Sequence, residues 1–272
     1  MLCPSNRLTF PHIYLNLEHL SHKGKATLSP TTWLKRFSFN LLEFFLPRLC
    51  LFCGGVVAEE AKAAVCPDCE AKIAWAESPL CPRCGLVFAS REGEDHLCGP
   101  CQTEAPPFRR ALAAAVYDGP AAEAITKFKY SRRQDYLPVM QTWLQQPHCL
   151  ELVNAADLLV PVPLHKKRLK FRGFNQALLL AQVFNKQKPL EREILVRVRH
   201  TVPQTGLSPR ERRDNVRRAF AVPRPEEVKG KNILLVDDVY TTGATVKECA
   251  RALIKAGARQ VDVLTVARVR YD

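Results

Sequence analysis

Short, continuous apolar runs from residue 111 onward predict the strands of the chain. These runs cover residues 111–117, 157–163, 194–198 and 233–236, and a further strand is expected near residue 261. Each lacks the strict alternation of polar and apolar positions that marks a strand with one solvent-facing side, so we expect strands buried on both faces. Strands of that kind are typical of parallel sheets.

Segments with helical spacing lie between these runs. Residues 120–128, 177–184 and 246–256 are suited to packed helices, and the last of them stops at Gly257. Strands that alternate with helices predict an α/β fold, a Rossmann-like parallel sheet with helices on both faces. We assign this domain to residues 111–272.

The first 110 residues have a different character. Residues 1–32 show no persistent period, so we expect a disordered extension, with the natural start near Thr31. Residues 33–49 place large apolar groups at mostly helical spacing and predict an amphipathic helix that packs on the following domain. A membrane-surface helix and a transit peptide are the alternatives. We group the helix with the cysteine-rich segment in one unit, residues 33–110.

Composition and charge narrow the range of partners. The chain has 272 residues and 47% hydrophobic content, which is enough to bury a core, and a net charge of +13 favours polyanionic partners. Residues 161–220 hold 15 Lys and Arg against 4 Asp and Glu, a net +11. The apolar patch at 37–46 is too short to span a bilayer, and we find no secretory signal. We therefore expect a cytoplasmic protein, peripheral to the inner membrane if the helix binds its surface.

The cysteines predict two metal sites. Eight of the eleven fall in four C-x-x-C pairs, separated by twelve, eleven and thirteen residues. A two-residue spacer lets both sulfurs of a tight turn reach one tetrahedral ion, and Gly54 and Gly85 directly follow a pair, where a positive φ is needed. A thioredoxin-like redox motif needs only one such pair beside a βαβ unit. Two zinc ribbons are therefore expected.

Each zinc site should be structural, because four thiolates leave no coordination position open for water. Sequential pairing needs only local folding, and we prefer it to interleaved pairing. The expected ligands are Cys50, Cys53, Cys66 and Cys69 at one site and Cys81, Cys84, Cys98 and Cys101 at the other.

A candidate phosphate site follows the strand at 233–236. Asp237 and Asp238 come next, at the carboxyl end of the strand, where open α/β sheets bind ligands. Small and hydroxyl-bearing residues then precede the helix at 246–256, so backbone amides and hydroxyls could hold a phosphate. A ribose 5-phosphate would suit this arrangement, whereas the plainer interpretation is a core strand and a polar turn. The expected cradle is Thr241, Thr242, Gly243, Ala244 and Thr245.

Residues 233–245, Ile-Leu-Leu-Val-Asp-Asp-Val-Tyr-Thr-Thr-Gly-Ala-Thr, resemble the thirteen-residue signature of type I phosphoribosyltransferases, and only Tyr240 departs from it. The resemblance implies that the site binds phosphoribosyl pyrophosphate (PRPP) with magnesium. Asp237 and Asp238 would then be the catalytic pair that orients the ribose. As an enzyme, such a protein would replace the pyrophosphate at C1 with a nitrogen nucleophile.

Basic segments are expected to reach the same crevice. Lys166 and Arg172 lie in a strand-to-helix loop and are candidates for the pyrophosphate end of the ligand. The run 127–133 mixes cations and aromatics, which suits ligand contact or a solvated helix end equally. The resemblance also places a closing loop at 200–215, with Arg210 and Arg212 as candidate ligand contacts. The alternative there is a short basic helix that begins at Pro209.

A wider resemblance covers residues 48–268. Pro-Val-Pro-Leu-His at 161–165, Arg-Gly-Phe-Asn-Gln-Ala at 172–177 and Pro-Gln-Thr-Gly-Leu at 203–207 occur in order after the cysteine module. In this arrangement the chain resembles the competence protein F (ComF) family of phosphoribosyltransferase-like proteins. The resemblance implies a type I phosphoribosyltransferase domain behind a small N-terminal zinc-ribbon module.

Two functions follow from these observations. In the first, a PRPP-binding protein acts in DNA uptake during natural transformation, and the resemblance implies single-stranded DNA and a DNA-uptake helicase as partners. In the second, an active phosphoribosyltransferase salvages nucleobases and has no role with DNA. No residue identifies the acceptor.

Overall fold

A computed structural model describes residues 47–58, 63–90, 92–131, 133–199 and 208–270. The predicted extension at 1–32 and nearly all of the predicted helix at 33–49 lie outside these residues. In the described part, no helix combines the length and the apolar character needed to cross a membrane.

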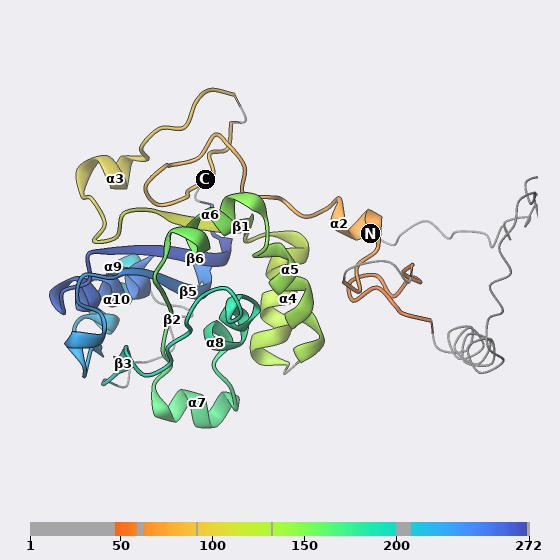
Figure 1. Cartoon of the computed structure of the whole chain (residues 1–272). Coiled ribbons are helices and arrows are strands. Elements are labelled where there is room, and N and C mark those ends of the chain that lie inside the picture. Colours follow the sequence, from red (N-terminus) through yellow and green to blue (C-terminus); the bar gives the residue numbers. More distant parts are fainter. Residues whose placement is uncertain (1–46, 59–62, 91, 132, 200–207, 271–272) are drawn as a thin grey trace, which may run out of the picture. The chain divides into compact units, whose positions relative to one another are not determined.

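The main sheet has four parallel strands in the order β1-β6-β5-β2 (Figure 1). The predicted parallel α/β sheet is therefore confirmed. β5 is longer than the 233–236 strand expected from sequence, because it pairs with β6 as far as Tyr240. The strands are β1 (Ala111–Val116), β2 (Leu158–Pro161), β5 (Asn232–Tyr240) and β6 (Gln260–Arg268).

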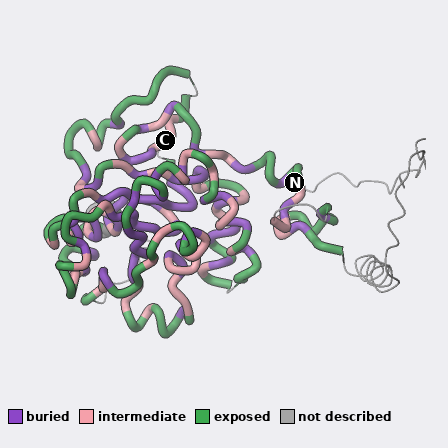
Figure 2. The backbone as a smooth tube through the Cα atoms, viewed as in Figure 1, coloured by how far each residue is buried: buried purple, intermediate pink, exposed green. Residues whose placement is uncertain are grey.

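Both faces of this sheet are buried. Successive side chains of a strand point to opposite faces, and accordingly Leu234 and Val236 of β5 pack in one apolar cluster while Ile233 and Leu235 pack in the other. The tube in Figure 2 is mostly purple along these strands. The first cluster is covered by α4 (Gly119–Tyr130), α5 (Leu137–Trp143), α6 (Pro147–Ala155) and α8 (Gln176–Ala181), and the second by α10 (Ala244–Lys255).

The third predicted strand, 194–198, is not in the main sheet. Only β3 (Val196–Arg197) is extended there, and it pairs antiparallel with β4 (Phe220–Ala221) in a separate two-stranded sheet. The apolar run was misleading because Ile194 and Leu195 are buried as core packing, each 1% exposed, and join no ladder.

Short helical segments fill the connections. The predicted helix at 177–184 is confirmed as α8 followed by a 3₁₀ turn, and those at 120–128 and 246–256 are confirmed as α4 and α10. The others are α2 (Pro67–Glu70), α3 (Gly99–Thr103), η1 (Gln134–Tyr136), α7 (Lys166–Arg172), η2 (Gln182–Phe184), α9 (Pro209–Val216) and η3 (Pro225–Glu227).

Both edges of the main sheet are covered by irregular chain. At the β1 edge, the Val116 amide donates to the Ala74 carbonyl and the Ala76 amide donates to the Ala114 carbonyl. At the β2 edge, the Leu159 amide donates to the Pro189 carbonyl. Uncovered strand edges can pair with strands of other chains, so the segment around Ala74 protects the β1 edge from such pairing.

Candidate functional site

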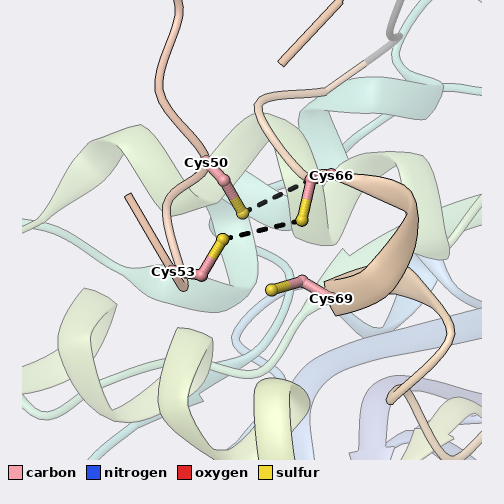
Figure 3. A group of neighbouring side chains, drawn as sticks. All are labelled: Cys50, Cys53, Cys66 and Cys69. Atoms are coloured by element: carbon pink, nitrogen blue, oxygen red, sulfur yellow. Dashed lines mark hydrogen bonds between the residues drawn. The ribbon is translucent and has the colours of Figure 1, made fainter. Parts of the chain in front are cut away.

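The eight cysteines form two separate groups of four, in the sequential pairing that we preferred. Within each group the sulfur atoms lie within 4.8 Å of one another. Figure 3 shows Cys50, Cys53, Cys66 and Cys69 with their thiols turned toward a common centre. Four sulfurs at this separation fit a tetrahedral zinc ion and leave no open position, so the donor set supports structural zinc.

The second group sits tightly against the sheet. Cys81 is fully buried and Cys84 is 3% exposed. Gly85 follows with φ +66°, and a side-chain β-carbon there would lie 2.6 Å from the Ala111 carbonyl oxygen. The Ala111 amide in turn donates to the Arg83 carbonyl. This cysteine turn is therefore packed directly on the start of β1.

A cavity of about 500 Å³ opens at the carboxyl ends of β2, β5 and β6. β2 ends at Pro161, beside Val236 of β5, so the last residues of β5 extend beyond their neighbour on that side. Asp237 and Asp238 lie in this extension and line the cavity, at 8% and 4% exposed. The structure thus brings the predicted acidic pair to the predicted edge of the sheet.

The two carboxylates have different partners. Asp238 Oδ1 forms an ion pair with Lys129 Nζ at 2.9 Å. Its Oδ2 is buried and has no hydrogen-bond partner among the described residues. Asp237 Oδ1 accepts from the Asp238 amide at 2.9 Å. A buried carboxylate oxygen without a donor is costly, so Asp238 is prepared for a ligand hydroxyl or a cation.

The start of α10 forms one wall of the cavity. Gly243, at φ +73°, is its N-cap and supplies no side chain, so the first backbone amides of the helix border the cavity beside Ala244 and Thr245. Thr241 also lines the cavity. Thr242 is not among its lining residues, and its hydroxyl accepts from the Ala244 amide at 3.4 Å.

The basic candidates divide into two groups. Arg172 is 6% exposed, lines the cavity and donates to Gln176 Oε1 at 2.8 Å, but Lys166 is exposed at the start of α7 and is not among the lining residues. Arg210 and Arg212 lie on α9, with side chains outside the described residues. Residues 200–207 of the closing loop expected at 200–215 also lie outside the described residues, and the alternative, a short helix that begins at Pro209, is confirmed as α9.

Comparison with known families gives two matches. A double zinc ribbon domain matches residues 41–110, and a phosphoribosyl transferase domain matches residues 172–271. The DNA utilization protein YhgH of Escherichia coli O157:H7 is 34% identical over 82% of this chain and 98% of its own length. Competence protein F of Haemophilus influenzae is 32% identical over 84% of this chain and 100% of its own length.

The chain belongs to the ComF family. Competence protein ComFC of Bacillus subtilis is a further relative, 26% identical over 75% of this chain and 84% of its own. Among solved structures, a B. subtilis glutamine PRPP amidotransferase, complexed with ADP and GMP, is 23% identical over 53% of this chain and 30% of its own, with a TM-score of 0.34. The relatives confirm the recognised family, and the two family models confirm the phosphoribosyltransferase domain and the zinc-ribbon module.

Sequence reasoning missed one cation and underrated another in this ComF-family site. Arg197 of β3 lines the cavity, but the misassigned third strand had placed it in the main sheet. Lys129 contacts Asp238, although the run 127–133 suited a solvated helix end equally well. Burial lowers the pKa of both Arg172 and Arg197, so an anion in the cavity would stabilise their charged forms.

The acidic pair also makes the stability of this ComF-family chain depend on pH. Burial and the neighbouring Asp238 carboxylate raise the pKa of Asp237 to about 7, and Lys129 opposes the rise. An unfolded aspartate ionises near pH 3.9. Between pH 3.9 and pH 7 Asp237 has lost its proton in the unfolded chain but keeps it in the folded chain. The free energy of unfolding therefore falls as pH rises toward 7.

Substituting Asp237→Asn should remove this pH dependence. As pH rises from 4.5 to 7, the free energy of unfolding of wild type should fall relative to that of the variant. The difference between the two should change by at most about 1.4 kcal/mol per pH unit. Urea unfolding at a series of pH values measures the difference. Parallel stability curves for the two proteins would contradict the assignment.

Proposed function

We propose that this chain binds PRPP, together with magnesium, in the cavity at the end of β5. The observation that carries the proposal is Asp238 Oδ2, which is buried without a partner beside the N-terminus of α10. An acidic oxygen that needs a donor and a helix start that attracts an anion are complementary to the hydroxyls and the phosphate of one phosphorylated ribose.

The remaining groups around the cavity suit the other end of the ligand. Lys129, Arg168, Arg172 and Arg197 all line it, so cations outnumber the two aspartates. A diphosphate would pair with such cations. Magnesium prefers carboxylate and phosphate oxygens, so Asp237 and Asp238 are the residues that would hold it. The ion would supply charge neutralisation at the diphosphate.

Calorimetric titration of PRPP into the full chain with magnesium tests the proposal. Binding heat is expected with PRPP, and a weaker response with ribose 5-phosphate, which lacks the diphosphate. Absence of heat with PRPP would contradict the proposal. Release of pyrophosphate in the presence of a panel of nucleobases would extend the function from binding to phosphoribosyl transfer.

We infer a second activity, binding of single-stranded DNA, from an exposed surface that borders the cavity at Tyr130. Relatives are named DNA utilization protein and competence protein F. Helix α7 exposes Phe171, at 82%, between cations, and Tyr130 of α4, at 62% exposed, lies under the Arg172 guanidinium at 5.7 Å from its ring centre. We call this surface the basic–aromatic face; its residues are Tyr130, Lys167, Lys170 and Phe171.

The charge of this face favours nucleic acid. No Asp or Glu occurs between Leu158 and Leu190, so α7 has no acidic neighbours in sequence. Exposed aromatic rings can stack on bases, and lysines can pair with phosphates without reading sequence. A DNA-uptake helicase remains the proposed protein partner. A cytoplasmic location is also part of the proposal, since cysteines arranged as metal ligands suit a reducing compartment.

Two substitutions on the basic–aromatic face test the DNA proposal. Phe171→Ala should weaken binding of a labelled oligothymidylate by about 1–3 kcal/mol, because a stacked base is lost. Lys170→Ala should reduce the slope of log K against log salt by about 0.7, the value for one phosphate contact on a single strand. Fluorescence anisotropy at several salt concentrations gives both quantities.

Matched controls are available on other surfaces. Ile254, exposed at 42% on α10, is the apolar control, and Lys186 is the exposed basic control. Ile254→Ala and Lys186→Ala should leave affinity and salt slope unchanged. If the controls weaken binding as much as Phe171→Ala and Lys170→Ala do, the DNA site is not on this face.

A further inference from the structure

Arg268, the last residue of β6, joins two parts of the molecule that the sequence separates widely. The residue is 4% exposed. Nη2 donates to Cys84 Sγ at 3.4 Å, and Nη1 donates to the Thr241 carbonyl at 3.1 Å and to the Tyr240 carbonyl at 3.4 Å. One buried side chain thus contacts a cysteine of the second cysteine group and the backbone at the start of the expected phosphate cradle, which we call the phosphate loop.

The same guanidinium also fixes an aromatic ring. Its central carbon lies 3.9 Å from the ring centre of Tyr240, a separation suited to a cation–π contact. Phe108, which follows the second cysteine group, also packs edge-on with the Tyr240 ring, and the two ring centres are 6.3 Å apart. Tyr240 is therefore held between the cysteine module and the end of β6.

Tyr240 in turn sets the backbone at the start of α10. A β-carbon placed on Gly243 would lie 2.2 Å from the Tyr240 hydroxyl, so the ring occupies the space that any side chain at 243 would need. Tyr240 is the residue that departs from the phosphoribosyltransferase signature. The departure now has a structural explanation: the ring is a spacer between Arg268 and the glycine that begins the cradle.

We propose that Arg268 is a positioning residue through which metal at the second cysteine site fixes the phosphate loop. A zinc-bound thiolate accepts a charge-assisted hydrogen bond, and outer contacts of this kind orient metal sites and the groups attached to them. Zinc also holds Cys84 in place, because ribbon turns of this type fold only around their ion. The inference rests on the proposed PRPP site.

The first cysteine site does not share this connection. Cys50 and Cys69 pack in the apolar cluster of α4, α5 and α6, whereas Cys84 packs in the same cluster as Tyr240 and Ala244. The first ribbon contacts η1, where the Tyr136 hydroxyl donates to the Leu51 carbonyl at 2.8 Å. The coupling should therefore be specific to the second site.

Three variants of the full chain test the proposal: Arg268→Gln, Cys84→Ser and, as the matched control, Cys53→Ser. Calorimetry with magnesium and PRPP measures affinity, and metal analysis measures zinc per chain. Hydrogen exchange of residues 240–246 without ligand measures the order of the loop. Arg268→Gln and Cys84→Ser should each weaken PRPP binding by about tenfold and speed exchange in the loop, whereas Cys53→Ser should change neither.

The double variant Arg268→Gln/Cys84→Ser should bind PRPP no more weakly than the single variant with the lower affinity, because both substitutions break the same connection. Arg109→Lys is the control for an arginine that pairs with β6 elsewhere: the half-exposed Arg109 guanidinium binds the buried Asp262 of β6 at 2.7 Å. Unchanged loop exchange in Arg268→Gln, or equal effects of Cys53→Ser and Cys84→Ser, would overturn the proposal. If wild type binds no PRPP, the PRPP site is wrong, and the exchange measurement alone then decides the role of Arg268.

Discussion

Asp238→Asn should reduce PRPP affinity by about 10–100-fold, the largest effect that we expect from a single substitution in the cavity. The wild-type Oδ2 is buried and awaits a ligand partner, while Oδ1 binds Lys129. An amide at this position keeps the shape but loses the charge, and a hydrogen bond to a charged group is worth about 1.5–3 kcal/mol. Calorimetry with magnesium present measures the change.

The matched control is Asp262→Asn. Asp262 is also a buried carboxylate, 5% exposed, but it binds Arg109 near the opposite end of β6. Both variants remove one buried negative charge from the same sheet, so a loss of general stability would affect them alike. Equal PRPP affinities for Asp238→Asn and wild type would show that the acidic pair does not contact the ligand.

Cys81→Ser should cost more stability than any substitution considered above outside the two cysteine groups. The side chain is fully buried in the second cysteine group, and this group packs on the start of β1. Zinc at a four-cysteine site contributes free energy comparable to the whole stability of a domain. We expect one zinc ion per chain in place of two and a Tm lower by about 10 °C or more.

Cys149→Ser separates the loss of metal from the loss of a buried thiol. Cys149 is also fully buried, but it lies on α6 outside both cysteine groups. Its substitution should lower Tm modestly and leave two zinc ions bound, as metal analysis and thermal denaturation would show. A zinc content of two in Cys81→Ser would contradict the pairing of the second site.

The parts of the site that sequence predicted are those in which local order fixes chemistry. A C-x-x-C turn brings two sulfurs together whatever surrounds it, and an acidic pair after a buried strand must lie near the strand's carboxyl end. The main sheet followed for the same reason, because a run such as 233–236 can only be buried on both faces. These features needed no knowledge of distant contacts.

The remaining features depend on contacts between distant segments. Lys129 reaches Asp238 from a helix more than one hundred residues earlier, and nothing in the run 127–133 fixes its direction. Ile194 and Leu195 are as apolar as a strand, but they pack in the apolar cluster on one face of the sheet instead of pairing. Arg268 stands at a strand's carboxyl end, the same signal that identified Asp237, yet only the folded chain shows that Cys84 lies next to it.

The hydrogen bonds that Ala74 and Ala76 form along β1 limit where the chain can be truncated. A fragment that begins at residue 111 would lose this cover and present a bare row of amides and carbonyls, which is a template for edge-to-edge aggregation. The segment between the two cysteine groups thus also caps the sheet, and the phosphoribosyltransferase domain should be expressed together with it.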